Sequence, residues 1–153
     1  MSIAQESLTA IEDILADMSS EQANRVPDLP GANSPYAIGT HCLGMVEYWG
    51  GSVIAGLRIP RDRDGEFHAT GDPQVLCENI ARLRQRFAEW AAIGVREGAR
   101  DRSAVGTARS ETARTASATW MLLHVLRELS QHLGQLEITR DILTHNEQAS
   151  PAT

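Results

Sequence analysis

Lysine is absent from this chain of 153 residues, and all fourteen basic residues are arginine. Without lysine, neither Schiff-base chemistry nor a phosphate-binding loop of the lysine type is available. An excess of positive charge is also lacking, because twenty acidic residues outnumber the arginines and give a net charge of −6 at pH 7. Nucleic acids and anionic membranes bind clustered positive charge, so we expect neither as a partner.

Cysteine is scarce, and long apolar runs are missing. Cys42 and Cys77 are the only cysteines, and no Cys-x-x-Cys motif is present, which excludes a zinc knuckle and a dithiol redox motif. No apolar run approaches the roughly 18 residues that a membrane span requires, and the first residues lack the pattern of a signal peptide. The simplest interpretation is a reduced, cytoplasmic protein.

Apolar residues recur with helical spacing in four segments, and no segment alternates with period two. Helices are expected over about residues 3–18, 36–57, 73–96 and 118–143, and the polar residues 98–117 predict a long solvated connection. Ile3 and Val75 are among the expected core positions. The chain length fits one domain over residues 1–153. Together these features predict an all-α fold, a four-helix bundle.

The last expected helix carries His124, Glu128 and His132 at intervals of four residues. Residues one helical turn apart share a face, so a carboxylate and an imidazole there can hold one divalent ion. His124 and His132 are about 12 Å apart along the helix, so they cannot both bind the same ion. Glu128 lies at the margin of an apolar arc, where an ionised carboxylate needs a cation or hydrogen bonds. A neighbouring arginine, Arg127 or Arg140, is the alternative partner for it.

A third ligand has to come from another helix. The candidates are His41, His68 and His145, and only His41 shares a face with apolar residues of its predicted helix. Cys42 is adjacent to His41 and points about 100° away from it, so we interpret it as a small core residue. The predicted metal site is therefore His41, Glu128 and His132.

Three segments together resemble a known family. They are His41 with the segment Val46–Gly51, the segment Arg61–Phe67, and the series from His124 through Glu128 and His132 to Gly134 and Gln135. The chain resembles the DinB-like superfamily and is most similar to its branch of mycothiol-dependent maleylpyruvate isomerases and S-transferases. The resemblance implies a DinB-like four-helix bundle and places the metal triad at the same three residues. It also implies a homodimer, to which Trp49, Trp90 and Trp120 offer contact surface.

The resemblance implies a thiol S-transferase or isomerase. Two imidazoles and one carboxylate leave a coordination position open, as in catalytic zinc sites, and the same donors suit nickel, iron and manganese. Mycothiol or a similar small thiol is the expected cosubstrate, activated as a thiolate to attack a small electrophile. Around the ligands, His124 could either orient Glu128 or contact solvent, and Arg63 and Glu66 could form an ion pair that fixes a loop.

Two other functions fit the same residues. The first is a non-catalytic, DinB-like metal-binding protein linked to stress. The second is a metal-dependent hydrolase, for which Glu47 and Glu137 are the candidate general bases.

Overall fold

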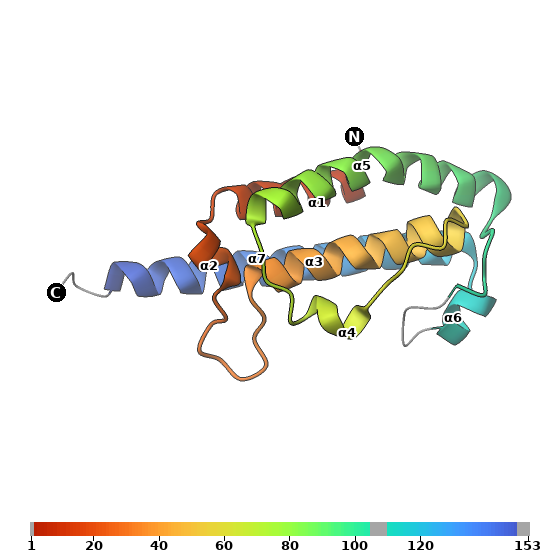
Figure 1. Ribbon diagram of the computed structural model, residues 1–153. Helices are drawn as coiled ribbons and strands as arrows, with labels where there is room; N and C mark the ends of the chain where they lie inside the picture. The colour runs from red at the N-terminus through yellow and green to blue at the C-terminus, as the bar shows by residue number, and fades with distance from the viewer. Residues whose placement is uncertain (1, 105–109, 150–153) are drawn as a thin grey trace.

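The computed structural model describes residues 2–104 and 110–149, and each element in these residues is a helix. The elements are α1 (Ile3–Ala16), α2 (Ser20–Asn24), α3 (Pro35–Val46), η1 (Glu47–Ile54), α4 (Arg63–Glu66), α5 (Pro73–Glu97), α6 (Ser110–Thr115) and α7 (Ala118–Ala149). The long helices α1, α3, α5 and α7 lie side by side and pack against one another, while α4 lies against α3 (Figure 1). The predicted all-α class is confirmed.

Local sequence signals define where the helices begin. The Ser2 hydroxyl accepts a hydrogen bond from the Gln5 backbone N–H, and the Gln5 side chain bonds back to Ser2 in a capping box. At the start of α5, the Asp72 carboxylate accepts a hydrogen bond from the Gln74 backbone N–H, and proline occupies the first helical position. These caps satisfy backbone donors that have no partner within the helix, so each helix starts at a fixed residue.

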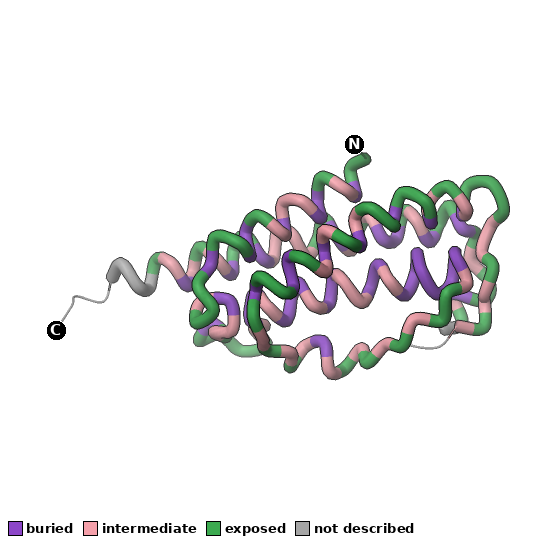
Figure 2. Tube along the Cα trace, turned by 45° about the horizontal axis from the view of Figure 1, so that its top comes forward, coloured by how far each residue is buried: buried purple, intermediate pink, exposed green. Residues whose placement is uncertain are grey.

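The apolar stripes of the long helices form one core, seen as the inward-facing buried positions in Figure 2. Two residues expected there are exposed: Ile3 by 62% and Val75 by 50%. Ile3 opens α1, and the buried face of that helix is carried by Ala4 and Leu8 instead. Val75 precedes the buried Leu76, and adjacent helical positions diverge by about 100°, so only one of the two faces the core.

The second predicted helix, expected over residues 36–57, is one continuous rod with two geometries. It begins as the α-helix α3 and becomes the π-helix η1 at Glu47. A Cβ at Gly50 would lie 2.9 Å from Cε3 of Trp90, so the glycine lets this backbone approach α5 closely. Glycine also weakens the intrinsic α-helical preference, and packing therefore decides the geometry here. Residues 48–55 are buried throughout, which anchors this end of the rod.

The predicted solvated connection over residues 98–117 contains a helix, α6, so that prediction is wrong over residues 110–115. Residues 105–109 of this connection lie outside the described part of the chain. The Arg102 guanidinium donates hydrogen bonds to the carbonyls of Ala113 and Ala116, at 3.3 and 2.5 Å. These bonds satisfy carbonyls at the end of α6 that have no helical partner.

The last helix continues beyond its expected end near residue 143, to Ala149. Within the ranges described above, none of the helices combines the length and apolar character that crossing a bilayer requires.

Candidate metal centre

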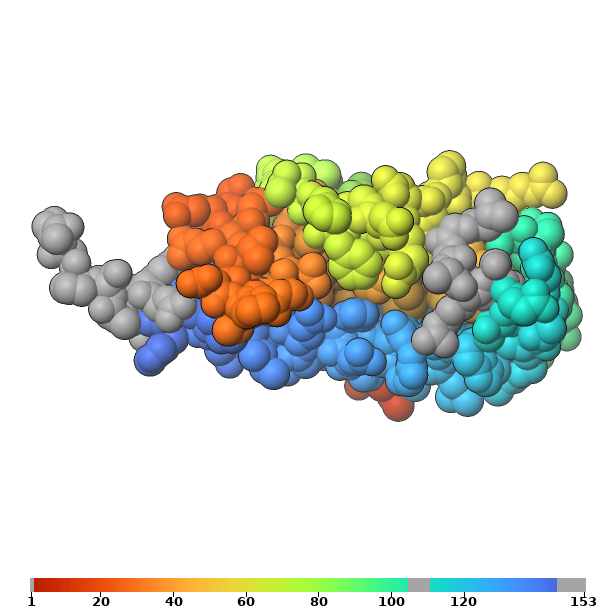
Figure 3. Space-filling model, turned by 90° about the horizontal axis from the view of Figure 1, so that it is seen from below, coloured from red at the N-terminus to blue at the C-terminus, as the bar shows by residue number. Residues whose placement is uncertain are grey.

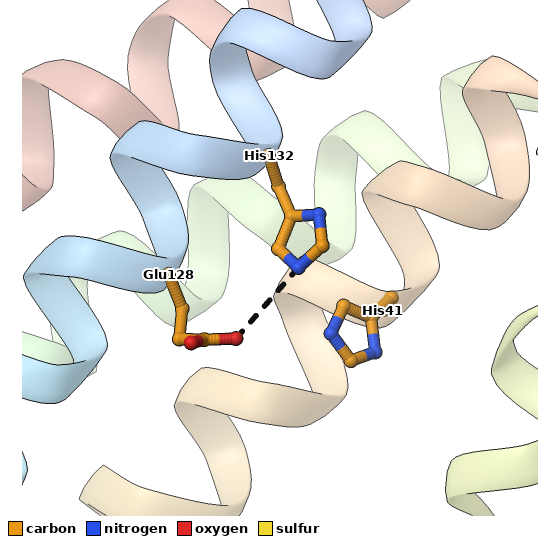
Figure 4. Close-up of side chains that lie close together, drawn as sticks. All are labelled: His41, Glu128 and His132. Carbon is orange, nitrogen blue, oxygen red and sulfur yellow. Dashed lines mark ion pairs between the residues drawn. The ribbon is translucent and has the colours of Figure 1, made fainter.

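The three predicted ligands meet between α3 and α7. His41 lies in the middle of α3, and Glu128 and His132 lie on consecutive turns of α7, which packs against α3 (Figure 4). Each side chain offers one possible ligand atom, an imidazole nitrogen or a carboxylate oxygen, and these three atoms lie within 4.8 Å of one another. Two ligands of one zinc ion lie about 3.4 Å apart, so small side-chain movements would bring all three atoms onto a single cation. The structure thus brings together residues 41, 128 and 132.

Protonation of the site suits a cation. Burial alone would raise the pKa of Glu128. The hydrogen bond and charge of Arg127, together with the nearby His124 and His132, outweigh burial and hold this pKa below its usual value. Burial, with a smaller contribution from the neighbouring His41, lowers the pKa of His132, although the hydrogen bond that His132 donates to the Gln135 amide oxygen acts against them. At neutral pH the site therefore offers an ionised carboxylate and a neutral His132 imidazole, the forms in which these groups bind metals.

His41 is held by a buried carboxylate. Its Nδ1 donates to Oε2 of Glu66 at 2.8 Å, and both side chains are buried. The Phe67 ring stacks on the imidazole with centroids 4.5 Å apart. A proton fixed on Nδ1 leaves the lone pair on Nε2, which is the usual arrangement of a metal-binding histidine and its carboxylate partner.

Glu66 is itself held by Arg61. The Arg61 Nε and a terminal nitrogen donate to the two carboxylate oxygens at 2.6 and 2.9 Å, in a bidentate pair. The predicted partner was Arg63, and that prediction is wrong: Arg63 contacts Asp64 and the Phe67 ring instead. The short helix α4, capped by Asp62 through the Gly65 N–H, turns Glu66 inward and Arg63 outward.

His132 is held in a similar way from its own helix. Its Nδ1 lies 3.0 Å from Oε1 of Gln135, and its Nε2 lies 3.8 Å from Oε2 of Glu128. The amide oxygen accepts the Nδ1 proton, which again leaves Nε2 as the ligand atom. Both histidines therefore present the same nitrogen to the space between them.

The remaining candidates lie around the site. His124 Nδ1 lies 3.8 Å from Glu128 Oε1, and its ring stacks on Trp120. Arg127 contacts Glu128, as the alternative interpretation expected, whereas Arg140 pairs with Asp141. Arg127 is an exposed side chain, so it can release one carboxylate oxygen to a cation at little cost.

His68 and His145, the other two candidates for the third ligand, are exposed and do not belong to this group. His68 Nδ1 instead lies 3.1 Å from the Asp64 backbone oxygen.

Comparison with known families places the chain in one of them. The model of the mycothiol-S-transferase (MST) family matches residues 2–145, which include all three residues and their partners. The chain belongs to the mycothiol-S-transferase family. No curated protein and no solved structure matches the chain. The family predicted from the sequence is confirmed.

Gly44 makes room for the buried carboxylate in this mycothiol-S-transferase family member. It lies three residues after His41, and a Cβ there would lie 2.1 Å from Oε1 of Glu66. We expect Gly44→Ala to displace Glu66 from His41 and to weaken zinc binding about tenfold, the effect of losing an outer hydrogen bond. Competition with a fluorescent zinc chelator measures this change.

Gly134 provides the matched control. It is also a helical glycine, on α7 two residues from His132, but nothing lies within 4 Å of the position of its Cβ. Gly134→Ala is expected to leave zinc affinity unchanged and to stabilise the fold by up to about 1 kcal/mol, because alanine is the better helix former. Equal zinc affinities of the two variants would contradict the role of Gly44.

Proposed function

We propose that this chain is a single-domain, metal-dependent thiol S-transferase. A divalent cation is held by His41, Glu128 and His132, and the thiol is mycothiol or a close relative. The observation that carries the proposal is the meeting of two oriented imidazoles and an ionised carboxylate in a member of a mycothiol-S-transferase family. The expected electrophile is a small molecule.

The donor set fits a divalent cation. Two neutral nitrogens and one carboxylate leave a coordination position open and one positive charge uncompensated. When bound, a zinc ion supplies Lewis acidity that lowers the pKa of a thiol from its usual value near 8.5. Zinc is the metal we propose first, and nickel, iron and manganese suit the same donors.

The chain's own residues position the site. Glu66 and Gln135 hold the two Nδ1 protons, so neither imidazole can rotate or switch tautomer freely. Phe67 covers one face of His41 and keeps water from it, while the Glu128 and His132 side chains remain 18% and 13% exposed. The cosubstrates would therefore approach from the α7 side of the triad.

The nucleophile has to come from outside the protein. Cys42 is fully buried, and burial together with the nearby carboxylates raises its pKa to about 12. Cys77 is also buried, and burial raises its pKa as well. Neither thiol forms a thiolate at neutral pH, which is the form that attacks electrophiles.

This burial gives a direct prediction about alkylation. In the folded protein at pH 8, iodoacetamide is expected to label Cys42 at least about a hundredfold more slowly than free cysteine, because the reactive form is almost absent. Mass spectrometry of timed samples measures the rate, and the urea-unfolded chain serves as the fully reactive control. Rapid labelling of Cys42 in the folded state would indicate an internal nucleophile.

Thiol consumption tests the proposed function. The protein is stripped of metal, reloaded with zinc, and mixed with mycothiol and monobromobimane, and the fluorescent conjugate is followed over time. The zinc-loaded protein is expected to form conjugate faster than the stripped protein. Stoichiometric zinc binding without any acceleration would support the non-catalytic metal-binding protein instead.

We also propose a cytoplasmic homodimer. Trp49 and Trp90 are buried in the core, whereas Trp120 is 39% exposed, so Trp120 alone of the three offers surface to a second copy. Light scattering of the purified protein is expected to give twice the chain mass of 16.7 kDa. A monomer mass at micromolar concentration would contradict the dimer.

A further inference from the structure

Arg127 lies at the open side of the metal centre. The opposite side is covered, because α4 and the segment before it lie over α3 (Figure 3). Arg127 directly precedes Glu128 on α7, and its Nη2 donates a hydrogen bond to Oε1 of that carboxylate. The Arg127 side chain is 59% exposed, whereas Glu128 and His132 are 18% and 13% exposed. Arg127 is therefore the most exposed charged group in contact with the predicted ligands.

The two oxygens of Glu128 have different neighbours. Oε1 accepts the hydrogen bond from Arg127 and lies 3.8 Å from Nδ1 of His124. Oε2 lies 3.8 Å from Nε2 of His132, the nitrogen that faces the other ligands. A cation bound through Oε2 would leave the contact between Arg127 and Oε1 in place. The guanidinium is thus held only one carboxylate group away from the predicted metal position.

Most of the Arg127 guanidinium is available to a ligand. A guanidinium can donate hydrogen bonds from each of its nitrogens, and within the part of the chain that the structure describes only Nη2 of Arg127 does so. Glu128 is also the one carboxylate that pairs with Arg127 there. The remaining donors can contact a second planar anion, in the bidentate geometry that arginine and carboxylates share.

The charges around the centre favour an anionic electrophile. A divalent cation, the Glu128 carboxylate and a thiolate cancel one another, so the positive charge of Arg127 is left over. Behind His41, the charges of Arg61 and Glu66 cancel as a buried ion pair. A carboxylate on the electrophile would balance the remaining charge.

We propose that Arg127 determines substrate specificity by binding the carboxylate of an anionic electrophile, next to the sulfur that attacks it. The inference rests on the thiol S-transferase function proposed above and names the class of its electrophile. A carboxylate close to the reacting carbon would hold that carbon at the centre. A neutral electrophile of the same size lacks this contact.

Iodoacetate and iodoacetamide test the inference, because they share a leaving group and differ in charge. With either reagent, the mycothiol sulfur forms a bond to the methylene carbon, and iodide leaves with the electron pair of the C–I bond. In Arg127→Gln at saturating zinc, the ratio of kcat/KM for iodoacetate to that for iodoacetamide is expected to fall about fivefold, the size of a charged contact at a half-exposed group. Effects that act only through Glu128 change both rates alike and cancel in the ratio. Arg127→Lys keeps the charge and should retain most of the ratio.

Arg140→Gln is the matched control for this experiment. Arg140 lies on the same helix and is 37% exposed, but it pairs with Asp141 and does not contact the predicted ligands. The substitution changes the net charge by the same amount, and the ratio is expected to stay unchanged. An equal fall in Arg127→Gln and Arg140→Gln would show a general effect of net charge and would contradict the inference.

Binding of propionate gives a readout that needs no turnover. Propionate has the charge and similar shape of iodoacetate without the leaving group, and propionamide is its neutral match. In the ¹⁵N-labelled, zinc-loaded protein, propionate is expected to shift the Nε–H signal of Arg127, and propionamide is expected to leave it unchanged.

The two readouts separate this inference from the proposed function. Turnover of mycothiol with an unchanged ratio in Arg127→Gln, or propionate shifts at His132 without one at Arg127, would overturn the inference and leave the transferase intact. A propionate shift at Arg127 without turnover of any thiol would support the anion site and reject the transferase.

Discussion

Replacing His132 with alanine is expected to lower the affinity for zinc by more than about a hundredfold. Loss of an outer hydrogen bond alone costs about 10–100-fold, and this substitution removes a ligand atom. His132 lies close to both other predicted ligands. Its ring centroid is 4.7 Å from that of His41, and its Nε2 is 3.8 Å from Oε2 of Glu128. Isothermal titration of the stripped protein with zinc measures the change.

His68→Ala is the matched control for this experiment. It removes the same kind of side chain from an exposed position, where His68 Nδ1 lies 3.1 Å from the Asp64 backbone oxygen. Its zinc affinity is expected to equal that of the unaltered protein. An equal loss in both variants, or none in His132→Ala, would mean that the cation binds elsewhere.

Replacing Arg61 with alanine is expected to destabilise the fold by about 3 kcal/mol at pH 7. Arg61 and Glu66 form a buried ion pair, and removal of one partner leaves the other charge buried and uncompensated. The same substitution frees the carboxylate that orients His41, so zinc affinity should fall as well. Urea denaturation followed by circular dichroism measures the stability of the metal-free protein.

This loss depends on pH in a defined direction. Burial alone would raise the pKa of Glu66, but hydrogen bonds from Arg61 and His41 outweigh it and lower the pKa. The ionised carboxylate therefore adds stability above the unfolded pKa of about 4.3, and this stability is lost as the pH falls through the lower folded pKa. The difference between Arg61→Ala and the unaltered protein should shrink below about pH 4.

Arg63→Ala controls for the loss of an arginine from the same segment. The Arg63 side chain is 41% exposed and its ion pair with Asp64 is at the surface, so we expect a change within about 0.5 kcal/mol. A destabilisation as large as that of Arg61→Ala would show that the buried pair has no special role.

Much of the centre could be predicted from the sequence because its ligands follow local rules. Glu128 and His132 are one helical turn apart, and His41 is a lone histidine on an apolar helical face. The packing of α3 on α7 then brings the three together. Gln135 has the same local character, since it lies three residues after the histidine that it orients.

The contact of Glu66 with His41 could not be predicted by such rules. Glu66 lies 25 residues from His41, in a charged segment that looks solvated, and only the fold turns it inward. The choice of Arg61 over Arg63 as its partner depends on the orientation of a helix of four residues, α4. A pair of this kind is set by long-range packing, which spacing along the chain does not reveal.

Long-range packing also explains where the secondary structure differs from the sequence prediction. The rod formed by α3 and η1 has enough apolar residues to predict a helix, but its π-helical part lies where Gly50 packs closely against Trp90, a long-range contact. The short helix α6 is stabilised from outside by Arg102, which bonds to the carbonyls at its end. Neither contact leaves a periodic signal in the sequence.

A crystal structure of the zinc-loaded protein, with anomalous diffraction measured at the zinc edge, tests the central claim most directly. The account predicts one fully occupied peak, about 2.0–2.2 Å from Nε2 of His41, Nε2 of His132 and a carboxylate oxygen of Glu128. Glu66 and Gln135 should still contact the two Nδ1 atoms. Zinc bound through Nδ1 of either histidine, or bound only at other residues, would contradict it.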